Sequence, residues 1–591
     1  MYIIFDTETT GLPRSYKAPI SDVDNWPRVV QLAWQLHDDD GRLVEHKDFL
    51  IKPDGFDIPY GSEDIHGIST ELASKKGIDL SEGLDLFEEA LSKASFLVGH
   101  NVNFDINVLG CEFFREERST AWVEKNILDT CTEKTANICK LLGGRGGRFK
   151  LPTLSELHEH LFDAQFTEAH NATADVEATT RCFLELIRLK TFTADELGKA
   201  DDYFITYSVA NPEITQPAGL KHLNLKAESE KLRKDAEHLG SSNVDQEVIV
   251  DLQKLEDLSF THLHNHSQYS ILQSTAKVSG IIEKAYAHGM HAIALTDTGN
   301  MMAAFHFEAA ANKINKRIRT EKAQAEEEGR AYDKKEILPI IGCEFNVCRD
   351  RNDKTQKDNG SKVVLLAKNK EGYQNLIKLA SIAYTEGMYY VPRIDKGIVE
   401  AYKDNLMVLS GGIQGEISNL LLNVGEKQAE ESLNWWKNVF KEDFYIELTR
   451  HGVELESRLN PSLVKLANKH GVKLIATNNS FYVEKEDSIA HDVLLCVKDN
   501  QLVETPKGRG RGFRYGLEND EYYIKSSDQM KNLFQDLPQA LLNTEEIVKK
   551  CDPYPLARDV LLPEYDIPSQ FISAEDKKDG GKRGENAFLR H

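Results

Sequence analysis

Two carboxylates follow the first apolar run of the chain at a spacing that can build half of a metal site. Residues 2–5 are aromatic or β-branched, which is typical of a buried strand, and they lead directly into Asp6 and Glu8. Because residues two apart on a strand point to the same side, the two carboxylates are expected to project together. Residues 9–12 then end the strand, so the pair lies where α/β folds place reactive groups. Hard oxygen ligands of this kind suit magnesium or manganese.

Two later segments carry further acids at the start of predicted helices. Residues 96–100 predict a second strand, and the apolar spacing after it predicts a helix with Asp105 in its first turn. Residues 169–180 open another predicted helix, with Asp175 inside it and His170 just before it. Four carboxylates in one pocket would repel one another unless divalent cations neutralised them. A histidine beside them is suited to take a proton from an attacking water.

Together these segments resemble the three motifs of the DEDDh 3′-5′ exonucleases, the family of the epsilon proofreading subunit of bacterial DNA polymerase III. Asp6 and Glu8 match the first motif, and Asp105 matches the second. His170 and Asp175 match the third at the family's His-x4-Asp spacing. The resemblance implies an RNase H-like α/β domain with a mixed sheet and helices. It also implies that the four carboxylates hold two Mg²⁺ (or Mn²⁺) ions and that His170 is the general base.

Length and composition indicate a globular protein of several domains. The chain has 591 residues, more than one core usually fills, and 40% of them are hydrophobic. A net charge of −23 is unusual for a nucleic-acid enzyme, so DNA contacts should be local, with Arg145, Arg148 and Lys150 as candidates. The cysteines show no disulfide or zinc pattern and no apolar stretch suits a membrane span. We therefore expect a soluble, cytoplasmic protein without a membrane partner.

From residue 259 onward, short apolar runs alternate with predicted helices. The seven runs are residues 260–264, 292–296, 338–342, 363–367, 406–410, 444–448 and 473–477. Repeated βα units predict a parallel barrel in which polar residues just past the strands line one rim. His264 and His266 follow the first run, and Asp297 and Glu344 follow the next two. These four side chains are expected to converge as a metal-binding group.

This region resembles the PHP domain of the alpha-subunit family of bacterial DNA polymerase III, which implies a distorted (β/α)7 barrel. The segments that carry the resemblance are 262–270, 296–300, 341–347, 365–369 and 391–395. Several ligands of that family's metal-retaining members are replaced here, by Gln273, Thr298, Lys362, Gly412 and residues 479–481. Charged lysine offers no lone pair, and glycine and phenylalanine offer no ligand atom. The loss implies a structural PHP domain in which the four remaining side chains hold at most one weak ion.

The sequence thus predicts an α/β protein in four parts. They are an exonuclease domain (1–190), a partly helical linker (191–258), a PHP domain (259–540) and the start of a connection to a polymerase palm (541–591), whose catalytic aspartates are not found in this chain. The resemblances imply proofreading at a single-stranded or frayed primer-template DNA 3′ end, with the sliding clamp and other polymerase III subunits as partners. Two alternatives stay open: a stand-alone repair or RNA-trimming exonuclease, and a non-catalytic replisome scaffold.

Overall fold

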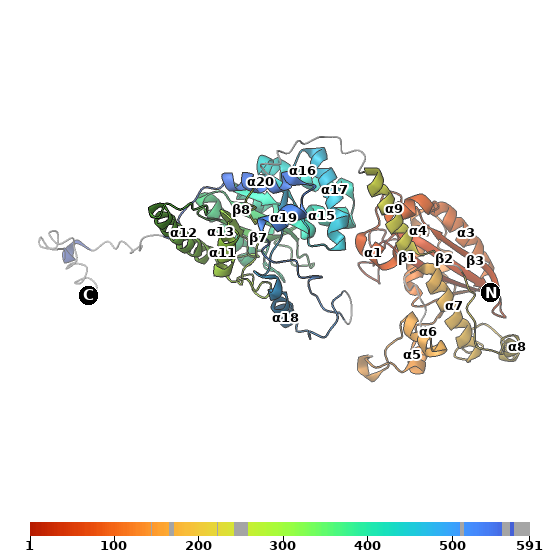
Figure 1. Ribbon diagram of the computed structural model, residues 1–591. Coiled ribbons are helices and arrows are strands. Elements are labelled where there is room, and N and C mark those ends of the chain that lie inside the picture. The colour runs from red at the N-terminus through yellow and green to blue at the C-terminus, as the bar shows by residue number, and fades with distance from the viewer. Residues whose placement is uncertain are drawn as a thin grey trace. The chain divides into compact units, whose positions relative to one another are not determined.

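The computed structural model describes residues 1–143, 145–164, 171–220, 223–240, 258–508, 513–557 and 568–572, with the backbone alone at residues 145 and 234–240 (Figure 1). The chain divides into two compact units. The first holds Met1–Val250, Ile413–Asn438 and Pro461–Leu466, and the second holds Asp251–Gly412, Val439–Asn460 and Ala467–His591. Among the described helices, none is both long enough and apolar enough to cross a bilayer.

A five-stranded mixed sheet forms the centre of the first unit. Its strands, in the order β3-β2-β1-β4-β5, are β1 (Tyr2–Thr9), β2 (Val29–His37), β3 (Leu43–Leu50), β4 (Phe96–Gly99) and β5 (Asn126–Asp129). The first three strands are antiparallel, and β2 and β3 form a hairpin around Gly41. β4 runs parallel to both β1 and β5. Parallel pairing needs crossover connections, and helices provide them.

Helices cover both faces of this sheet (Figure 1). They are α1 (Tyr60–His66), α2 (Thr70–Lys76), α3 (Leu80–Lys93), α4 (Asn103–Arg115), α5 (Glu133–Cys139), α6 (Leu154–Phe162) and α7 (Ala172–Arg188). On one face, Ile3 and Phe5 of β1 share a core with side chains of α3 and α4. On the other face, Tyr2 and Ile4 share a core with side chains of α7. The two-residue period of β1 therefore assigns its odd and even positions to different helical layers.

The segment 191–258, which the sequence predicts to be a linker, packs into the first unit over its described residues. It forms α8 (Tyr203–Ala210) and α9 (Leu225–Gly240). Tyr203 and Tyr207 lie in the core that contains Tyr2, and Leu225 lies in a smaller core with Val30. These few buried side chains are widely spaced along a polar segment, so the sequence does not reveal that the segment packs into a core.

The second unit is built on a curled sheet of seven strands. They are β6 (Ala292–Leu295), β7 (Leu338–Cys348), β8 (Ser361–Ala367), β9 (Arg393–Asp395), β10 (Leu406–Leu409), β11 (Phe444–Thr449) and β12 (Lys473–Thr477). The order is β12-β11-β10-β8-β7-β6, and β9 pairs with β7. The mixed α/β architecture that the sequence predicts is confirmed for both units.

Two local details of the predicted barrel are wrong. β8 is antiparallel to both β7 and β10, because residues 349–360 connect β7 to β8 without a helix and the chain simply turns back. Residues 260–264 lie outside the strands of the described range 258–508. They still run beside β6, since the carbonyl oxygen of His262 accepts a hydrogen bond from the N–H of Ala294 at 2.8 Å.

Ten described α-helices follow residue 258 along the chain. They are α11 (Val278–Ala287), α12 (Ala304–Glu327), α13 (Lys370–Thr385), α14 (Lys396–Ala401), α15 (Glu416–Asn423), α16 (Glu426–Phe440), α17 (Glu454–His470), α18 (Ser488–Asp499), α19 (Ser527–Leu533) and α20 (Pro538–Lys549). Ile547 of α20 lies in one core with Leu263 and Tyr445. The core of the second unit therefore continues past residue 540.

Candidate functional site

Successive side chains of β1 point to opposite faces of the sheet, and this alternation determines which helix each acidic side chain meets. Asp6 and Glu8 have the same parity as Tyr2 and Ile4, so they point toward the face of the sheet that α7 covers. Asp175 lies in the first turn of α7, as the sequence predicts. One ligand oxygen from each of these three carboxylates lies within 4.8 Å of the other two. The structure therefore brings together three of the four predicted acidic ligands at distances that a shared cation can bridge.

Asp105, the fourth predicted acid, approaches the end of β1 from the opposite face of the sheet. It lies in the first turn of α4, which begins just after β4, the parallel neighbour of β1. Thr7, which has the odd parity, donates to Asp105 Oδ1 from its backbone N–H at 3.0 Å and from its hydroxyl at 2.7 Å. The sequence analysis missed this role of Thr7, although the residue's place between the two strand carboxylates was a signal.

The electrostatics of the four acids indicate that a cation fits among them. Burial raises the pKa of Asp6 well above its ordinary value, and the charges of Asp105, Asp175 and Glu8 raise it further. Burial and the neighbouring Asp175 and Asp105 do the same to Glu8. Burial also raises the pKa of Asp105, against the opposing hydrogen bonds from Thr7. Because the donors are all carboxylate oxygens, the group suits a hard divalent cation.

Gln31 fixes the start of α7 relative to the sheet. Its side-chain oxygen accepts a hydrogen bond from the N–H of Ala172 at 3.2 Å, and its amide donates to Asp48 at 2.9 Å. Gln31 lies opposite Glu8 in the register of β1 and β2 and is only 2% exposed. A buried glutamine in an apolar strand is the signal that sequence reasoning passed over. It acts by placing the helix that carries Asp175.

The remaining predicted residues of the first unit do not add to this group. His170 lies outside the described residues, as does the side chain of Arg145. Arg148 forms an ion pair with Glu133. Lys150 forms one with Glu156 at 2.5 Å. Both of these described basic side chains are therefore partly neutralised, and their contact with DNA stays a prediction.

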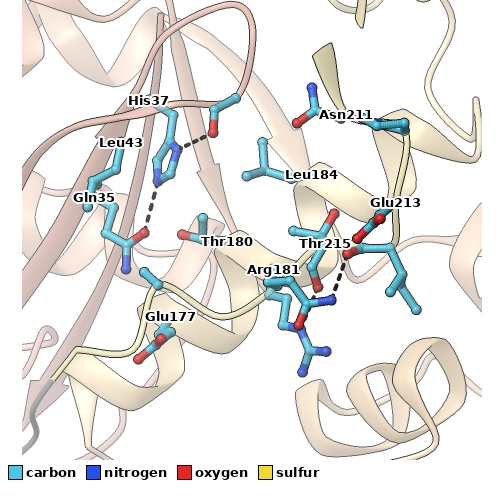
Figure 2. A pocket seen from close by; sticks show the side chains of 15 residues that line it. Gln35, His37, Leu43, Glu177, Thr180, Arg181, Leu184, Asn211, Glu213 and Thr215 are labelled. Carbon is cyan, nitrogen blue, oxygen red and sulfur yellow. Dashed lines mark hydrogen bonds between the residues drawn. The ribbon is translucent and has the colours of Figure 1, made fainter. Parts of the chain in front are cut away.

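A pocket of about 410 Å³ in the first unit is separate from the acidic group. Residues of β2, α7 and the segment 211–218 line it, and Figure 2 shows Arg181 of α7 donating to the carbonyl of Thr215. On the other side of the pocket, Nε2 of His37 lies 2.9 Å from the side-chain oxygen of Gln35. None of the four acids discussed above lines it.

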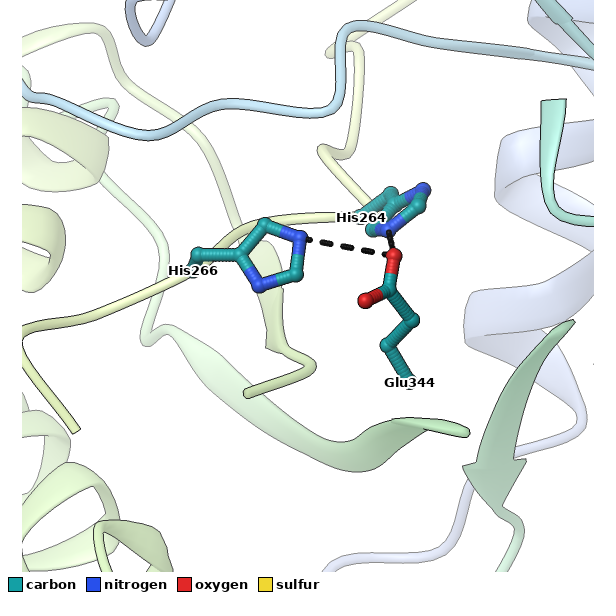
Figure 3. A group of neighbouring side chains, drawn as sticks. All are labelled: His264, His266 and Glu344. Atoms are coloured by element: carbon teal, nitrogen blue, oxygen red, sulfur yellow. Dashed lines mark hydrogen bonds and ion pairs between the residues drawn. The ribbon is translucent and has the colours of Figure 1, made fainter. Parts of the chain in front are cut away.

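The second unit gathers part of the predicted PHP group. Nitrogens of His264 and His266 and an oxygen of Glu344 lie within 4.8 Å of one another, and Figure 3 shows both rings directed toward the carboxylate. Asp297 is not in this group of described residues. Its carboxylate instead accepts hydrogen bonds from the backbone and hydroxyl of Ser267 and from the hydroxyl of Ser270, each at 2.7 Å.

Two charged residues contact the buried group of His264, His266 and Glu344, which we call the PHP pocket. Lys362 donates to Glu344 Oε1 at 2.7 Å. Glu447, which the sequence analysis did not identify, lies 2.7 Å from Nδ1 of His264. An acid inside the apolar run 444–448 was the available signal. Burial lowers the pKa of His264, but the carboxylates of Glu447 and Glu344 outweigh it and raise the pKa to about 9.

The second histidine is enclosed differently. Burial lowers the pKa of His266 to about 3, so its ring is neutral at physiological pH. Its nitrogens contact the hydroxyl of Ser270 at 3.1 Å and the side-chain oxygen of Asn479 at 3.0 Å. The ring of Phe481 stacks on it at 4.6 Å between centroids. A hydroxyl, an amide oxygen and an aromatic ring therefore surround His266.

Comparison with known families matches two separate parts of the chain. Residues 3–183 match the family described as Exonuclease. Residues 262–451 match the family described as PHP domain. The first match contains all five predicted residues of the acidic site, and the second contains the histidines and acids of the PHP pocket.

Curated relatives share the PHP region. The DNA polymerase III subunit alpha of Borreliella burgdorferi is 40% identical over 317 residues, which are 53% of this chain and 25% of the relative. That of Treponema pallidum is 36% identical over 323 residues, or 54% and 25% of the two chains. The matched part of this chain thus spans about a quarter of the length of these relatives.

Solved structures resemble the chain over about a third of its length. One is E. coli Exonuclease I in complex with a dA16 oligonucleotide, with a TM-score of 0.26 and 24% identity over 35% of this chain and 43% of that chain. Another is a 3′-exonuclease that recognises the histone mRNA stem-loop, with a TM-score of 0.25 and 10% identity over 32% and 82% of the two chains. The family matches and the curated relatives agree on the composition of the molecule: it joins an exonuclease domain to a PHP domain homologous to that of DNA polymerase III alpha subunits.

Proposed function

We propose that the first unit is a metal-dependent 3′-5′ exonuclease that removes nucleotides from DNA 3′ ends. The observation that carries the proposal is the convergence of Asp6, Glu8 and Asp175 within 4.8 Å, in a domain of the exonuclease family. Asp105 adds its charge to the same group. An acidic cluster of this density is costly to fold unless it binds cations, so its presence favours a catalytic use.

Each residue has a defined part in the proposed reaction. Asp6, Glu8, Asp105 and Asp175 would hold two Mg²⁺ or Mn²⁺ ions, which when bound supply charge neutralisation at the scissile phosphodiester. Thr7 orients Asp105, and Gln31 orients the helix of Asp175. His170, five positions before Asp175 in the sequence, is assigned as the base that takes a proton from the attacking water.

The proposed setting is DNA replication, as the amino-terminal part of a protein like the polymerase III alpha subunit. Support comes from the PHP-region relatives, which are named DNA polymerase III subunit alpha. The substrate would be a frayed primer end, because a single strand is held through backbone and stacking contacts whatever its sequence. The sliding clamp and other polymerase III subunits are the proposed partners. The PHP domain would have a structural role.

The test is degradation of a primer that carries a 5′ label and a mismatched 3′ terminus. With Mg²⁺ we expect a ladder of shortened labelled products, which shows that nucleotides leave from the 3′ end. Asp6→Asn should lower the rate by at least about a thousandfold, since it removes a metal ligand. Asp54→Asn, which changes an exposed acid of the same unit, is the matched control and should cut at the normal rate. Normal cutting by Asp6→Asn would refute the assignment.

The same assay separates the alternatives. Faster removal from an RNA 3′ end of equal length would favour an RNA-trimming enzyme over a proofreading one. Equal rates on matched and mismatched primers would favour a repair nuclease, because proofreading depends on fraying. No metal-dependent cleavage of any substrate would favour a scaffold.

A further inference from the structure

The PHP pocket of the second unit contains a lysine among its remaining metal-type ligands. Glu344 lies on β7 and Lys362 on the antiparallel strand β8. Glu344 is opposite Val364 in the register, so Lys362 is its diagonal neighbour on the same face of the sheet. This geometry places the ammonium 2.7 Å from Glu344 Oε1. The contact therefore follows from strand register and is not a chance approach of a surface side chain.

The carboxylate of Glu344 is surrounded by donors. Oε1 also accepts the hydroxyl of Thr298 at 2.9 Å, and Oε2 faces Nε2 of His264 at 3.3 Å. The other nitrogen of His264 faces Glu447 at 2.7 Å. Both ring nitrogens of His264 therefore face carboxylate oxygens, which accept hydrogen bonds.

The ammonium of Lys362 already supplies a positive charge beside the carboxylate of Glu344. A transition metal would lie about 2 Å from its carboxylate oxygen, which puts a double positive charge against the ammonium. The ion and the protonated lysine cannot share the pocket at low cost.

A latent set of ligands nevertheless remains. Oε2 of Glu447 is buried without a hydrogen-bond partner among the described residues. The Glu344 oxygen now held by Lys362 would become available if the ammonium were removed. His264 and His266 complete a group of imidazole and carboxylate donors that suits zinc.

We propose that the ammonium of Lys362 takes the place of a metal ion in the PHP pocket, so that this one side chain keeps the remaining ligands free of metal. This proposal rests on the proposed function, in which the PHP domain has a structural role. An internal cation then excludes the metal, and removing that cation should restore metal binding. If the general loss of ligands excluded the metal instead, no single substitution would restore binding.

The experiment counts zinc in the full chain with Asp6→Asn and Asp175→Asn, which remove the acidic group of the first unit. After dialysis against micromolar zinc, this parent should retain no zinc in the PHP pocket. Adding Lys362→Met should let it retain one further equivalent. Lys362→Arg keeps the cation and should retain none. Lys284→Met is the matched control, because Lys284 forms a similar ion pair with Glu484 at 2.6 Å and has similar exposure, 20% against 18% for Lys362.

Thermal unfolding gives a second measurement on the same proteins. Without zinc, Lys362→Met should unfold at a lower temperature than the parent, because Glu344 loses its cation. Zinc should restore most of the difference in this variant and should not change the unfolding temperature of the parent. A further variant, Lys362→His, removes the ammonium and adds an imidazole, so it should also bind zinc.

Three results would overturn the proposal. They are zinc in the PHP pocket of the parent, no zinc in either Lys362→Met or Lys362→His, and zinc in Lys362→His alone, which would mean that a missing ligand excludes the metal. Nuclease activity is measured separately on Lys362→Met in the otherwise unchanged chain with Mg²⁺. It should equal that of the unchanged chain, so a failure of the exonuclease assignment remains distinguishable from a failure here.

Discussion

The backbone N–H and the hydroxyl of Thr7 both donate to one oxygen of Asp105, at 3.0 and 2.7 Å, on the face of the sheet opposite to Asp6 and Glu8. The strand β1 therefore positions three of the four acids at once. Two of its own carboxylates project toward α7, and the residue between them positions the acid from α4.

Thr7→Val should lower the exonuclease rate by about tenfold, because a hydrogen bond to a charged group contributes on the order of 1.5–3 kcal/mol and only the backbone donor would remain. The loss should appear in kcat and leave KM nearly unchanged, since Thr7 acts through Asp105. Single-turnover kinetics would measure it. Thr206→Val, at an exposed threonine of the same unit, is the control. An unchanged kcat in Thr7→Val would show that Asp105 needs no such support.

Gln31→Met should destabilise the first unit by about 1–3 kcal/mol, because the buried N–H of Ala172 would lose its acceptor. The start of α7 would loosen, so activity should fall as well. Urea unfolding and the primer assay would measure the two effects. Gln216→Met changes an exposed glutamine of the same unit and should alter neither. Full activity in Gln31→Met would mean that other contacts suffice to place Asp175.

Asp175→Asn should abolish cleavage and yet make the metal-free first unit more stable, by about 1 kcal/mol. The physical reason is that burial and mutual repulsion raise the pKa of both Asp6 and Glu8, and the substitution removes one of the repelling charges. Calorimetry in EDTA would detect the higher unfolding temperature. Mg²⁺ should stabilise the unchanged protein but not the variant. Asp54→Asn serves as the control, and a destabilised Asp175→Asn would argue against a repulsive cluster.

Glu546→Gln should destabilise the second unit by about 2 kcal/mol at pH 7, allowing for partial exposure of the group. Burial raises the pKa of Glu546, but hydrogen bonds from Lys473, Lys550 and Tyr445 outweigh it and lower the pKa to about 2. Since the folded-state pKa is depressed, the stabilisation is complete above the unfolded-state pKa of about 4.3 and is lost as the pH falls toward about 2.

Unfolding measured from pH 7 to pH 2.5 would follow that loss as a shrinking difference between Glu546→Gln and the unchanged chain. Glu442→Gln is the control, because Glu442 is 85% exposed and lies 3.7 Å from Lys473. Its substitution should change stability by less than about 0.5 kcal/mol. A difference for Glu546→Gln that stays constant down to pH 2.5 would contradict the ion-pair account.

The sequence predicted those features that depend on short-range periodicity. The strand that presents Asp6 and Glu8 and the first-turn positions of Asp105 and Asp175 follow from residues within one turn or one strand. It failed where the partner is distant. The antiparallel course of β8 depends on how the chain turns between two strands, and apolar runs carry no direction.

By itself, then, the sequence indicated candidate metal-binding side chains and the local element that carries each of them, because hydrogen-bonded periodicity and residue chemistry are local properties. Only the tertiary structure decided which of them meet. The packing of α7 on the even face of β1 joins Asp175 to Asp6 and Glu8, and the register of β7 with β8 sets Lys362 against Glu344. Both contacts arise from the pairing of surfaces far apart along the chain, which no local pattern records.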